Sequence, residues 1–256
     1  VRRCALQVRD PGDQPQCVHV RGAGLDAAEH AVACEVRLYD RLFKVDAFKK
    51  ALLAAKSVAY IDPADRVLPD RASGGWPVTI EDPDGCARFV TVRVEGINPN
   101  APSPFWLRRR LSAAAIRSIS LAVDVTNYVM LDLGQPLHAF DAGKLTGPIT
   151  VRRAVGGEKL VTLDGVTRTL VADDVVVADG SGPISLAGVM GGESTEISSS
   201  TTTVVIEAAY WQPTMIARAA RRHRLPSEAS RRFERSVDPA IAAVAAEAAA
   251  DLLVHY

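Results

Sequence analysis

Apolar and polar residues alternate most regularly over residues 87–95, where ARFVTVRVE predicts a half-buried strand. Shorter apolar runs at 175–178, 184–187 and 204–206 predict further strands. Asp164 and Gly165 lie between KLVTL and VTRTL, a pattern that predicts a hairpin closed by a type I′ turn. The region from 149 to 207 is therefore expected to be β structure.

Helical patterns occur on both sides of this β region. Ser103 and Pro104 supply N-cap and first-turn chemistry for a helix that begins FWLRRRL. A second helix is predicted over 123–133, ended by Gly134 and Pro136. Three more follow at 213–224, 227–236 and 239–254, the last one opened by an Asp238-Pro239 cap.

The first quarter of the chain predicts shorter, mixed elements. We expect strands at 18–21 and 36–39, and helices at 25–34 and 45–60. Residues 61–77 hold three prolines and a Gly-Gly pair, which favours a linker between an N-terminal segment (1–75) and a larger domain (76–256). The chain starts with Val and stops inside a helical pattern, so we expect a fragment, truncated at the C-terminus. The predicted fold class is α+β, with a largely β core, as a mixed sheet or a barrel, flanked by helices.

Composition adds few constraints. The formal net charge is zero, so only local patches can indicate a nucleic-acid partner, and no apolar stretch is long enough to indicate a membrane span. The four cysteines are widely and irregularly spaced, which favours reduced thiols, a cytoplasmic location and no zinc site. No metal and no cofactor are expected for this chain.

The motifs of several common enzyme classes are absent from the sequence. The sequence has no GxSxG elbow, no Walker A loop and no HExxH helix. Gly22-x-Gly24-x-x-Ala27 resembles a dinucleotide-binding fingerprint, but the alternating strands and helices of such a fold do not follow it. A plain turn is the better interpretation.

His138 is the first candidate for chemistry. It follows a helix stop in GQPLHAFD, where we expect a turn whose side chain can face a cleft, although a lone histidine is more often structural. Thr126 and Asn127 offer a hydroxyl and an amide on the preceding element.

Glu207 is the second candidate, because it follows the apolar run VVI at the expected end of a strand. It is either a strand-end cap at the surface or a buried acceptor for a ligand hydroxyl. The residues alone favour the surface interpretation.

A glycine-rich segment, LAGVMGGE (186–193), joins two predicted strands. Glycines there allow a ligand to come close to the backbone, or they form a tight turn without a ligand.

The predicted helices between 213 and 235 carry seven arginines and only two glutamates. Arginine concentrated in this way can bind a phosphate backbone, but ordinary solvated surface or ion pairs between subunits are also consistent with it. The candidate tRNA-binding residues are Arg218, Arg221, Arg222 and Arg231.

Four separated segments together resemble one family. SPFWLRRRLSAAAIRSISLAVDVTNYVMLDLGQPLHAFD, LAGVMGGESTEI, VVIEAAYW and LPSEASRRFERSVDP are similar, in order and spacing, to the B3/B4 region of the phenylalanyl-tRNA synthetase β subunit. Residues 10–40 are weakly similar to the segment of that subunit that follows its OB-fold domain, whereas residues 40–75 show no such resemblance.

The resemblance implies a B3/B4 domain that hydrolyses tyrosine wrongly attached to tRNA(Phe). It also implies that the parent enzyme pairs this subunit with an α subunit and charges tRNA(Phe) using ATP and Mg²⁺. Ligase activity is not expected from this chain alone. A non-catalytic RNA-binding or assembly module, a stand-alone deacylase and a degenerate fragment are the alternatives.

The resemblance also implies roles for particular residues. Glu207 corresponds to the residue that recognises the para-hydroxyl of tyrosine, and His138 to the histidine of the editing pocket, where it is either a general base or an orienting group. The expected substrate-binding positions are Arg117, Thr126, Asn127, Gly191, Ser227 and Ala229. Two departures bear on this correspondence: Ser227 replaces a common threonine, and SISL (118–121) replaces the commoner PINN.

Overall fold

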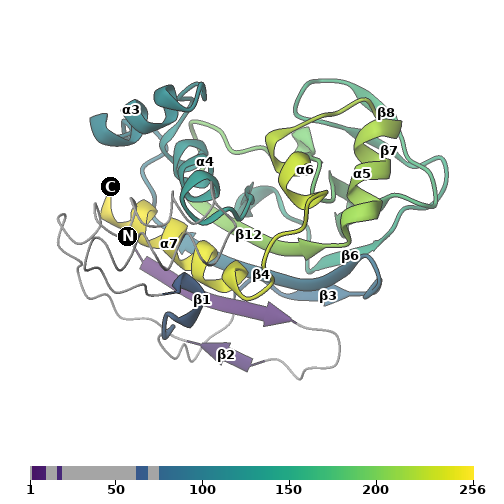
Figure 1. Cartoon of the computed structure of the whole chain (residues 1–256), viewed down its shortest axis with the longest axis horizontal. Helices are drawn as coiled ribbons and strands as arrows, with labels where there is room; N and C mark the ends of the chain where they lie inside the picture. Colours follow the sequence, from purple (N-terminus) through teal and green to yellow (C-terminus); the bar gives the residue numbers. More distant parts are fainter. Residues whose placement is uncertain (1, 10–15, 19–61, 69–74) are drawn as a thin grey trace, which may run out of the picture.

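The computed structural model of the chain describes residues 2–9, 16–18, 62–68 and 75–256, and for 2–9 and 16–18 it describes the backbone alone. Two five-stranded sheets and a small hairpin are packed with helices (Figure 1). The predicted α+β class is confirmed. Within the described part of the chain the sheets remain open, so the mixed sheet, not the barrel, is the architecture found.

The first sheet is antiparallel throughout and has the strand order β2-β1-β4-β12-β5. Its strands are β1 (Arg2–Arg9), β2 (Gln16–Val18), β4 (Cys86–Glu95), β5 (Leu137–Asp141) and β12 (Thr203–Trp211). The predicted strand over 87–95 is thus confirmed, and it becomes the centre of the sheet.

The second sheet has the order β11-β10-β9-β6-β3, in which only β3 and β6 run parallel. Its strands are β3 (Val78–Ile80), β6 (Ile149–Arg153), β9 (Val175–Asp179), β10 (Gly182–Leu186) and β11 (Met190–Gly191). A separate hairpin pairs β7 (Lys159–Val161) with β8 (Thr167–Thr169). The β region predicted over 149–207 is confirmed.

Five α-helices and three 3-10 turns complete the described structure. The helices are α3 (Phe105–Ala113), α4 (Leu121–Leu133), α5 (Pro213–Arg222), α6 (Glu228–Phe233) and α7 (Ile241–His255). The 3-10 turns are η1 (Pro63–Asp65), η2 (Ala142–Lys144) and η3 (Glu193–Thr195). All five helical patterns predicted between 103 and 254 are present, with shifted ends.

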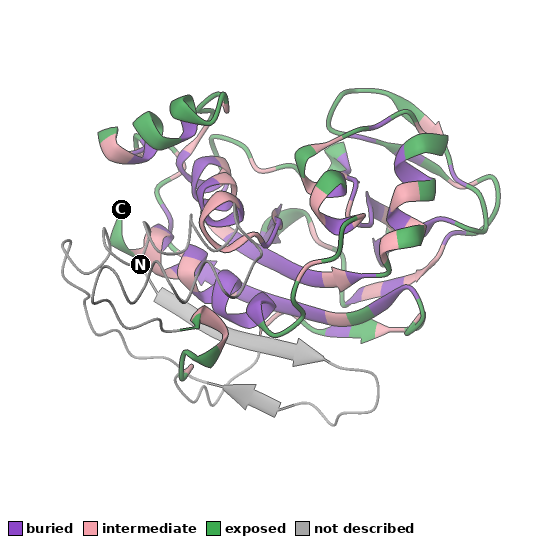
Figure 2. Ribbon diagram, in the orientation of Figure 1, coloured by how far each residue is buried: buried purple, intermediate pink, exposed green. Residues whose placement is uncertain are grey.

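Strand β12 separates two hydrophobic cores, because its side chains alternate between the faces of the first sheet. Val204, Ile206 and Ala208 join the core under α3, α4 and α7. Val205 and Trp211 join the core shared with the second sheet, α5 and α6. Figure 2 shows β12 and β4 buried along most of their length, between these layers.

Helix α7 lies close to the first sheet because it is rich in alanine. Ala242, Ala245, Ala246, Ala249 and Ala250 are fully buried against β4 and β12. Small side chains let the helix axis approach the sheet, so the centre of β12 is held rigidly from this side.

Several predicted element ends are wrong. Helix α3 is capped by Pro104 and begins at Phe105, because the hydroxyl of Ser103 is donated to Asp124 instead (2.5 Å). Helix α4 begins two residues early, because Ser120 caps it, and it ends as predicted at Gly134, whose φ is 73°. Helix α7 begins only at Ile241, after Ala240, so the Asp238-Pro239 cap is not its N-terminus.

The hairpin at Asp164-Gly165 is confirmed, but its turn is not type I′. Gly165 has φ of +74°, whereas Asp164 has no positive φ, and five residues separate the paired strands. The Asp164 carboxylate instead accepts the Thr162 hydroxyl (2.6 Å) and pairs with Arg168 (2.5 Å). Backbone hydrogen bonds from Gly165 N–H to the Thr162 carbonyl (2.8 Å) and from Thr162 N–H to the Val166 carbonyl (3.1 Å) close the loop, and the side-chain hydrogen bonds of Asp164 support it.

Upstream of residue 62 only β1 and β2 are described. β1 pairs with β4, so this early segment contributes a strand to the first sheet, which the sequence did not predict. The strand predicted over 18–21 overlaps β2 at Val18, and residues 19–21 lie outside the described residues. The elements predicted at 25–34, 36–39 and 45–60, and the Gly22-x-Gly24 motif, also lie outside them.

Candidate functional site

Glu207 and His138 are cross-strand partners. In the antiparallel pair of β12 and β5, Glu207 is in register with His138, and on its other side it is in register with Thr91 of β4. The three side chains therefore point to one face of the first sheet. This is the face that packs toward the second sheet, since Val205 lies on it.

The structure corrects the expected position of both residues. Glu207 lies in the middle of β12, because the strand continues to Trp211, so it is not a strand-end cap. It is 6% exposed, which selects the buried interpretation over the surface one. His138 lies in β5, not in a turn, because the chain resumes a strand directly after Pro136.

Neither side chain has a full set of hydrogen-bond partners. Within the described residues, Oε2 of Glu207 and Nε2 of His138 are enclosed and make no hydrogen bond. Burial raises the pKa of Glu207 to about 8 and lowers the pKa of His138 to about 4. Both groups are thus mainly neutral near pH 7, and each offers an unused polar atom to a ligand.

The ring of His138 is held between an aromatic neighbour and a glycine. Its ring centroid lies 4.5 Å from that of Phe140, edge to face. A Cβ at Gly191 would lie only 2.4 Å from His138 Cε1 and 2.7 Å from Nε2. Glycine is therefore required at this position of β11 for the imidazole to occupy its place.

The other end of the glycine-rich segment is fixed by helix α6. Ser227 caps this helix by accepting from the backbone N–H of Ser230 (2.9 Å), and its hydroxyl donates to the carbonyl of Val189 (2.9 Å). Ala229 follows on the same helix and packs on the core shared with the second sheet. Ser227 thus couples α6 to the segment that carries Gly191.

Three other predicted residues lie apart from this cluster. Thr126 and Asn127 are on α4, which packs against β5, and the hydroxyl of Thr126 donates to Val123 within its own helix (2.8 Å). Arg117 is exposed between α3 and α4. In the described part of the chain, no hydrogen bond or ion pair connects these three to His138 or Glu207.

The segment beside Arg117 is nevertheless well anchored. Asp124 is fully buried and accepts from the hydroxyls of Ser103 and Ser118 and from the backbone N–H of Ile119 (2.9 Å). The SISL segment therefore has a defined backbone, despite its departure from the commoner pattern.

Two further residues border the cluster and were not found from the sequence. Gln135 is fully buried and donates from Nε2 to the carbonyls of Pro136 and Ala209 (both 3.0 Å), while its Oε1 has no partner among the described residues. Leu163 of the β7–β8 loop lies 3.2 Å from the Cβ position at Gly191. No sequence motif marks either residue as part of a site, because their places beside the cluster result from tertiary packing.

The arginines of α5 and α6 fall into two groups. Arg222 pairs with the fully buried Asp174, and Arg231 pairs with Glu228 (3.1 Å). Arg218 and Arg221 are exposed, with no ion pair to any described residue. Only the second group has its charge fully available at the surface.

Two negative findings concern the described residues alone. No three His, Cys, Asp or Glu side chains there are close enough to hold a metal ion. None of the helices in that part of the chain has the length and hydropathy needed to span a membrane.

The fold and the site together define a class of α+β domain. It has two open sheets, and a buried carboxyl and a buried imidazole lie between them, enclosed by a glycine-rich loop and a capped helix. The chain belongs to the B3/4 domain family, whose model matches residues 85–256. Similar proteins are β subunits of phenylalanine–tRNA ligase. That of Nocardia farcinica is 56% identical over 213 residues, which cover 83% of this chain and 26% of the relative. That of Streptomyces avermitilis is 59% identical over 196 residues, covering 75% and 24%.

The family resemblance stated from the sequence is thereby confirmed. The chain spans about a quarter of the length of these relatives. Among solved structures, an N-terminal fragment of the phenylalanyl-tRNA synthetase β subunit from Pyrococcus horikoshii has a TM-score of 0.41 and 19% identity, over 61% of this chain and 52% of that one.

Proposed function

We propose that this chain carries a hydrolytic site that removes tyrosine mistakenly attached to tRNA(Phe). The observation that supports it most directly is the buried, unpartnered carboxyl of Glu207 beside the buried imidazole of His138. An unsatisfied polar atom in a protein interior costs about 1–3 kcal/mol, which a ligand hydroxyl can recover.

Glu207 would select the substrate through its hydroxyl. With a pKa of about 8 it is mainly protonated at neutral pH, so it can both donate to and accept from a phenol. A phenylalanine ring would fill the same space and leave this carboxyl unpaired. Sites built to bond a hydroxyl reject an analogue that lacks it more strongly than an apolar pocket rejects the reverse change.

His138 would position the reacting groups. A pKa of about 4 makes its imidazole a weak base, so we assign it to orienting the ester or the water through Nε2 and not to removing a proton in full. Gly191 lets the ring adopt its place, and Ser227 and Ala229 would form the opposite wall, with Thr126, Asn127 and Arg117 contributing polar groups farther out.

The reaction is an ester hydrolysis. Water attacks the carbonyl carbon of the tyrosyl ester, the bond from that carbon to the terminal ribose oxygen breaks, and the ribose oxygen takes up a proton. The products are free tyrosine and uncharged tRNA. The step needs neither a redox partner nor a metal.

The wider setting follows from the relatives, which are named as ligase subunits. The chain would act in the cytoplasm, bind tRNA(Phe) and work beside an α subunit. The ATP and Mg²⁺ of aminoacylation would belong to that larger enzyme, since this chain covers only about a quarter of its relatives.

The decisive experiment compares release of tyrosine and phenylalanine from charged tRNA(Phe). The wild-type chain should hydrolyse Tyr-tRNA(Phe) faster, and Glu207→Ala should reduce that rate about 5- to 100-fold, as expected for one lost hydrogen bond. Glu81→Ala, at an exposed carboxylate, is the control. Equal rates for wild type and Glu207→Ala would remove Glu207 from the site.

A second candidate function is a non-catalytic RNA-binding module. Arg218 and Arg221 on α5 favour it, because both are exposed and neither has an ion pair to a described residue. Salt-dependent binding of tRNA(Phe) without hydrolysis of either ester, in a folded chain, would select this alternative over editing.

A further inference from the structure

A stretch of positive charge without carboxylates lies on and around helix α3. Between Glu95 and Asp124 the chain carries four arginines and no carboxylate, although the protein as a whole is neutral. The nearest acidic group after the helix, Asp124, is fully buried and engaged by Ser103, Ser118 and Ile119. It therefore offers little compensation at the surface.

Of these four arginines, Arg110 is exposed but has its guanidinium engaged by neighbouring side chains. Arg110 donates to the hydroxyl of Tyr128 (3.0 Å) and lies 5.6 Å from the ring centroid of Trp106. Arg108, Arg109 and Arg117 are exposed and have no hydrogen-bond or ion-pair partner within the described residues. Three cations are thus presented to solvent from one helix and the segment after it.

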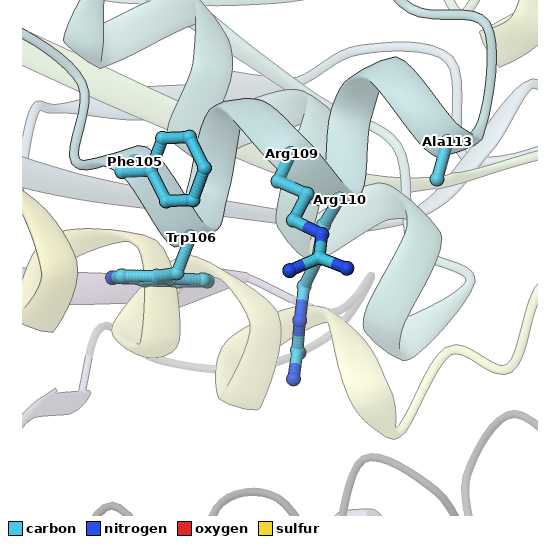
Figure 3. A pocket seen from close by; sticks show the side chains of 5 residues that line it. All are labelled: Phe105, Trp106, Arg109, Arg110 and Ala113. Carbon is cyan, nitrogen blue, oxygen red and sulfur yellow. The ribbon is translucent and has the colours of Figure 1, made fainter.

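An exposed aromatic ring accompanies these charges. Phe105 is 71% exposed, an unusual state for phenylalanine, and it lies one turn before Arg109 on the same face of α3. Phe105, Trp106, Arg109, Arg110 and Ala113 line a shallow hollow of about 370 Å³. Figure 3 shows the two guanidinium groups beside the aromatic rings.

The arginines of α5 and α6 are compensated in part, although Arg218 and Arg221 also have no ion pair to any described residue. There Glu228 pairs with Arg231 and with Arg232, and Asp174 pairs with Arg222. Those helices also present no exposed aromatic ring. The α3 face combines uncompensated cations with a stacking platform, and the α5–α6 surface does not.

We propose that the α3 face, formed by Phe105, Arg108 and Arg109, binds single-stranded RNA. Phosphates would be held by the guanidinium groups, and an unstacked base would lie on Phe105, which is how aromatic and arginine side chains engage single strands. The exposed cations favour an anionic partner. The exposed ring of Phe105, which shares its hollow with Trp106, fits a flat base better than an extended apolar protein surface.

The choice of RNA rests on the proposed function, which places a tRNA on this chain. Binding and hydrolysis can nevertheless fail separately. Loss of the α3 face should weaken RNA binding while Glu207 stays intact, and Glu207→Ala should slow hydrolysis of Tyr-tRNA(Phe) while RNA binding is unchanged.

The test measures binding of a fluorescein-labelled twelve-nucleotide oligoadenylate and of uncharged tRNA(Phe), by anisotropy across a salt series, with the full chain. Phe105→Ala should weaken oligoadenylate binding about fivefold or more. Arg109→Ala should weaken binding and lower the slope of log K against log salt by about 0.7, the value for one phosphate contact to a single strand.

A matched control reverses one exposed charge elsewhere: Lys159→Glu on β7 should bind as wild type. The proposal is overturned if the wild type does not bind the oligonucleotide, or if Phe105→Ala and Arg109→Ala bind it as tightly as Lys159→Glu does. Unchanged thermal unfolding of the α3 variants, all at exposed positions, ensures that a weaker signal reports binding.

Discussion

Glu207 of β12 and His138 of β5 are paired in register, and burial moves their pKa values in opposite directions. Each group loses its charge on entering the protein: the carboxyl by keeping a proton, the imidazole by losing one. The two residues are therefore adjacent through the pairing of their strands and not through an ion pair. This neutrality has measurable consequences for stability, because the two groups respond to pH with opposite sign.

Relative to the wild type, Glu207→Gln should gain free energy of unfolding as the pH rises from 4.5 to 8. The unfolded carboxyl titrates near 4.5 and the folded one near 8, so the stabilisation is fully present below pH 4.5 and is lost as pH rises to 8. The full effect is up to about 5 kcal/mol. Urea unfolding of the wild type and the variant from pH 5 to 9 measures it. Parallel curves would show that Glu207 is charged in the folded protein.

His138→Gln should act on the acid side. The unfolded imidazole titrates near 6.5 and the folded one near 4, so its contribution is fully present above pH 6.5 and is lost as pH falls to 4. The loss is up to about 3 kcal/mol. Relative to wild type, the variant should gain stability between pH 6.5 and 4. A difference that does not vary with pH would mean that His138 is protonated in the fold.

Gly191→Ala should displace the imidazole. The added Cβ would lie 2.4 Å from His138 Cε1, a distance that forces the ring to move. We expect hydrolysis of Tyr-tRNA(Phe) to fall by about tenfold or more, since small misplacements of reacting groups are costly. Gly156→Ala is the matched control, because a Cβ there meets no atom within 4 Å. If the two variants hydrolyse equally fast, the place of His138 does not matter to the reaction.

Much of the fold could be predicted because its signals are local. The alternation in β4 and the stop at Gly134 are each contained in a few consecutive residues. The full length of β12 could not be predicted, because Glu207 interrupts the apolar run and the two alanines after it are weak strand formers. All three become buried only through neighbours far along the chain.

The geometry of the candidate site depends even more on residues that are far apart in the sequence. His138 and Glu207 are brought together by the register of β5 and β12, and Gly191 meets the imidazole through packing of the second sheet on the first. Residue patterns indicated the types of side chain, and the family resemblance implied roles for them, which remain predictions. Neither could show that both polar groups are enclosed and unpartnered, because that is a property of the tertiary packing.

Arg222 and Arg218 lie one helical turn apart on α5 and should nevertheless respond differently to substitution. Arg222 pairs with Asp174, which is fully buried and also contacts His223 Nε2 at 2.8 Å. Arg222→Ala would leave that carboxylate with fewer partners and should lower the free energy of unfolding by about 1–3 kcal/mol. Urea unfolding at pH 7 measures this change.

Arg218 is exposed, so Arg218→Ala should leave unfolding within about 0.5 kcal/mol of wild type. If α5 contacts tRNA, the same variant should weaken tRNA(Phe) binding and lower its salt dependence, because one phosphate contact is lost. An effect of Arg218→Ala on stability but not on binding would assign α5 a structural role. Binding to RNA would then depend on the α3 face alone, where the arginines have no carboxylate partners in the described structure.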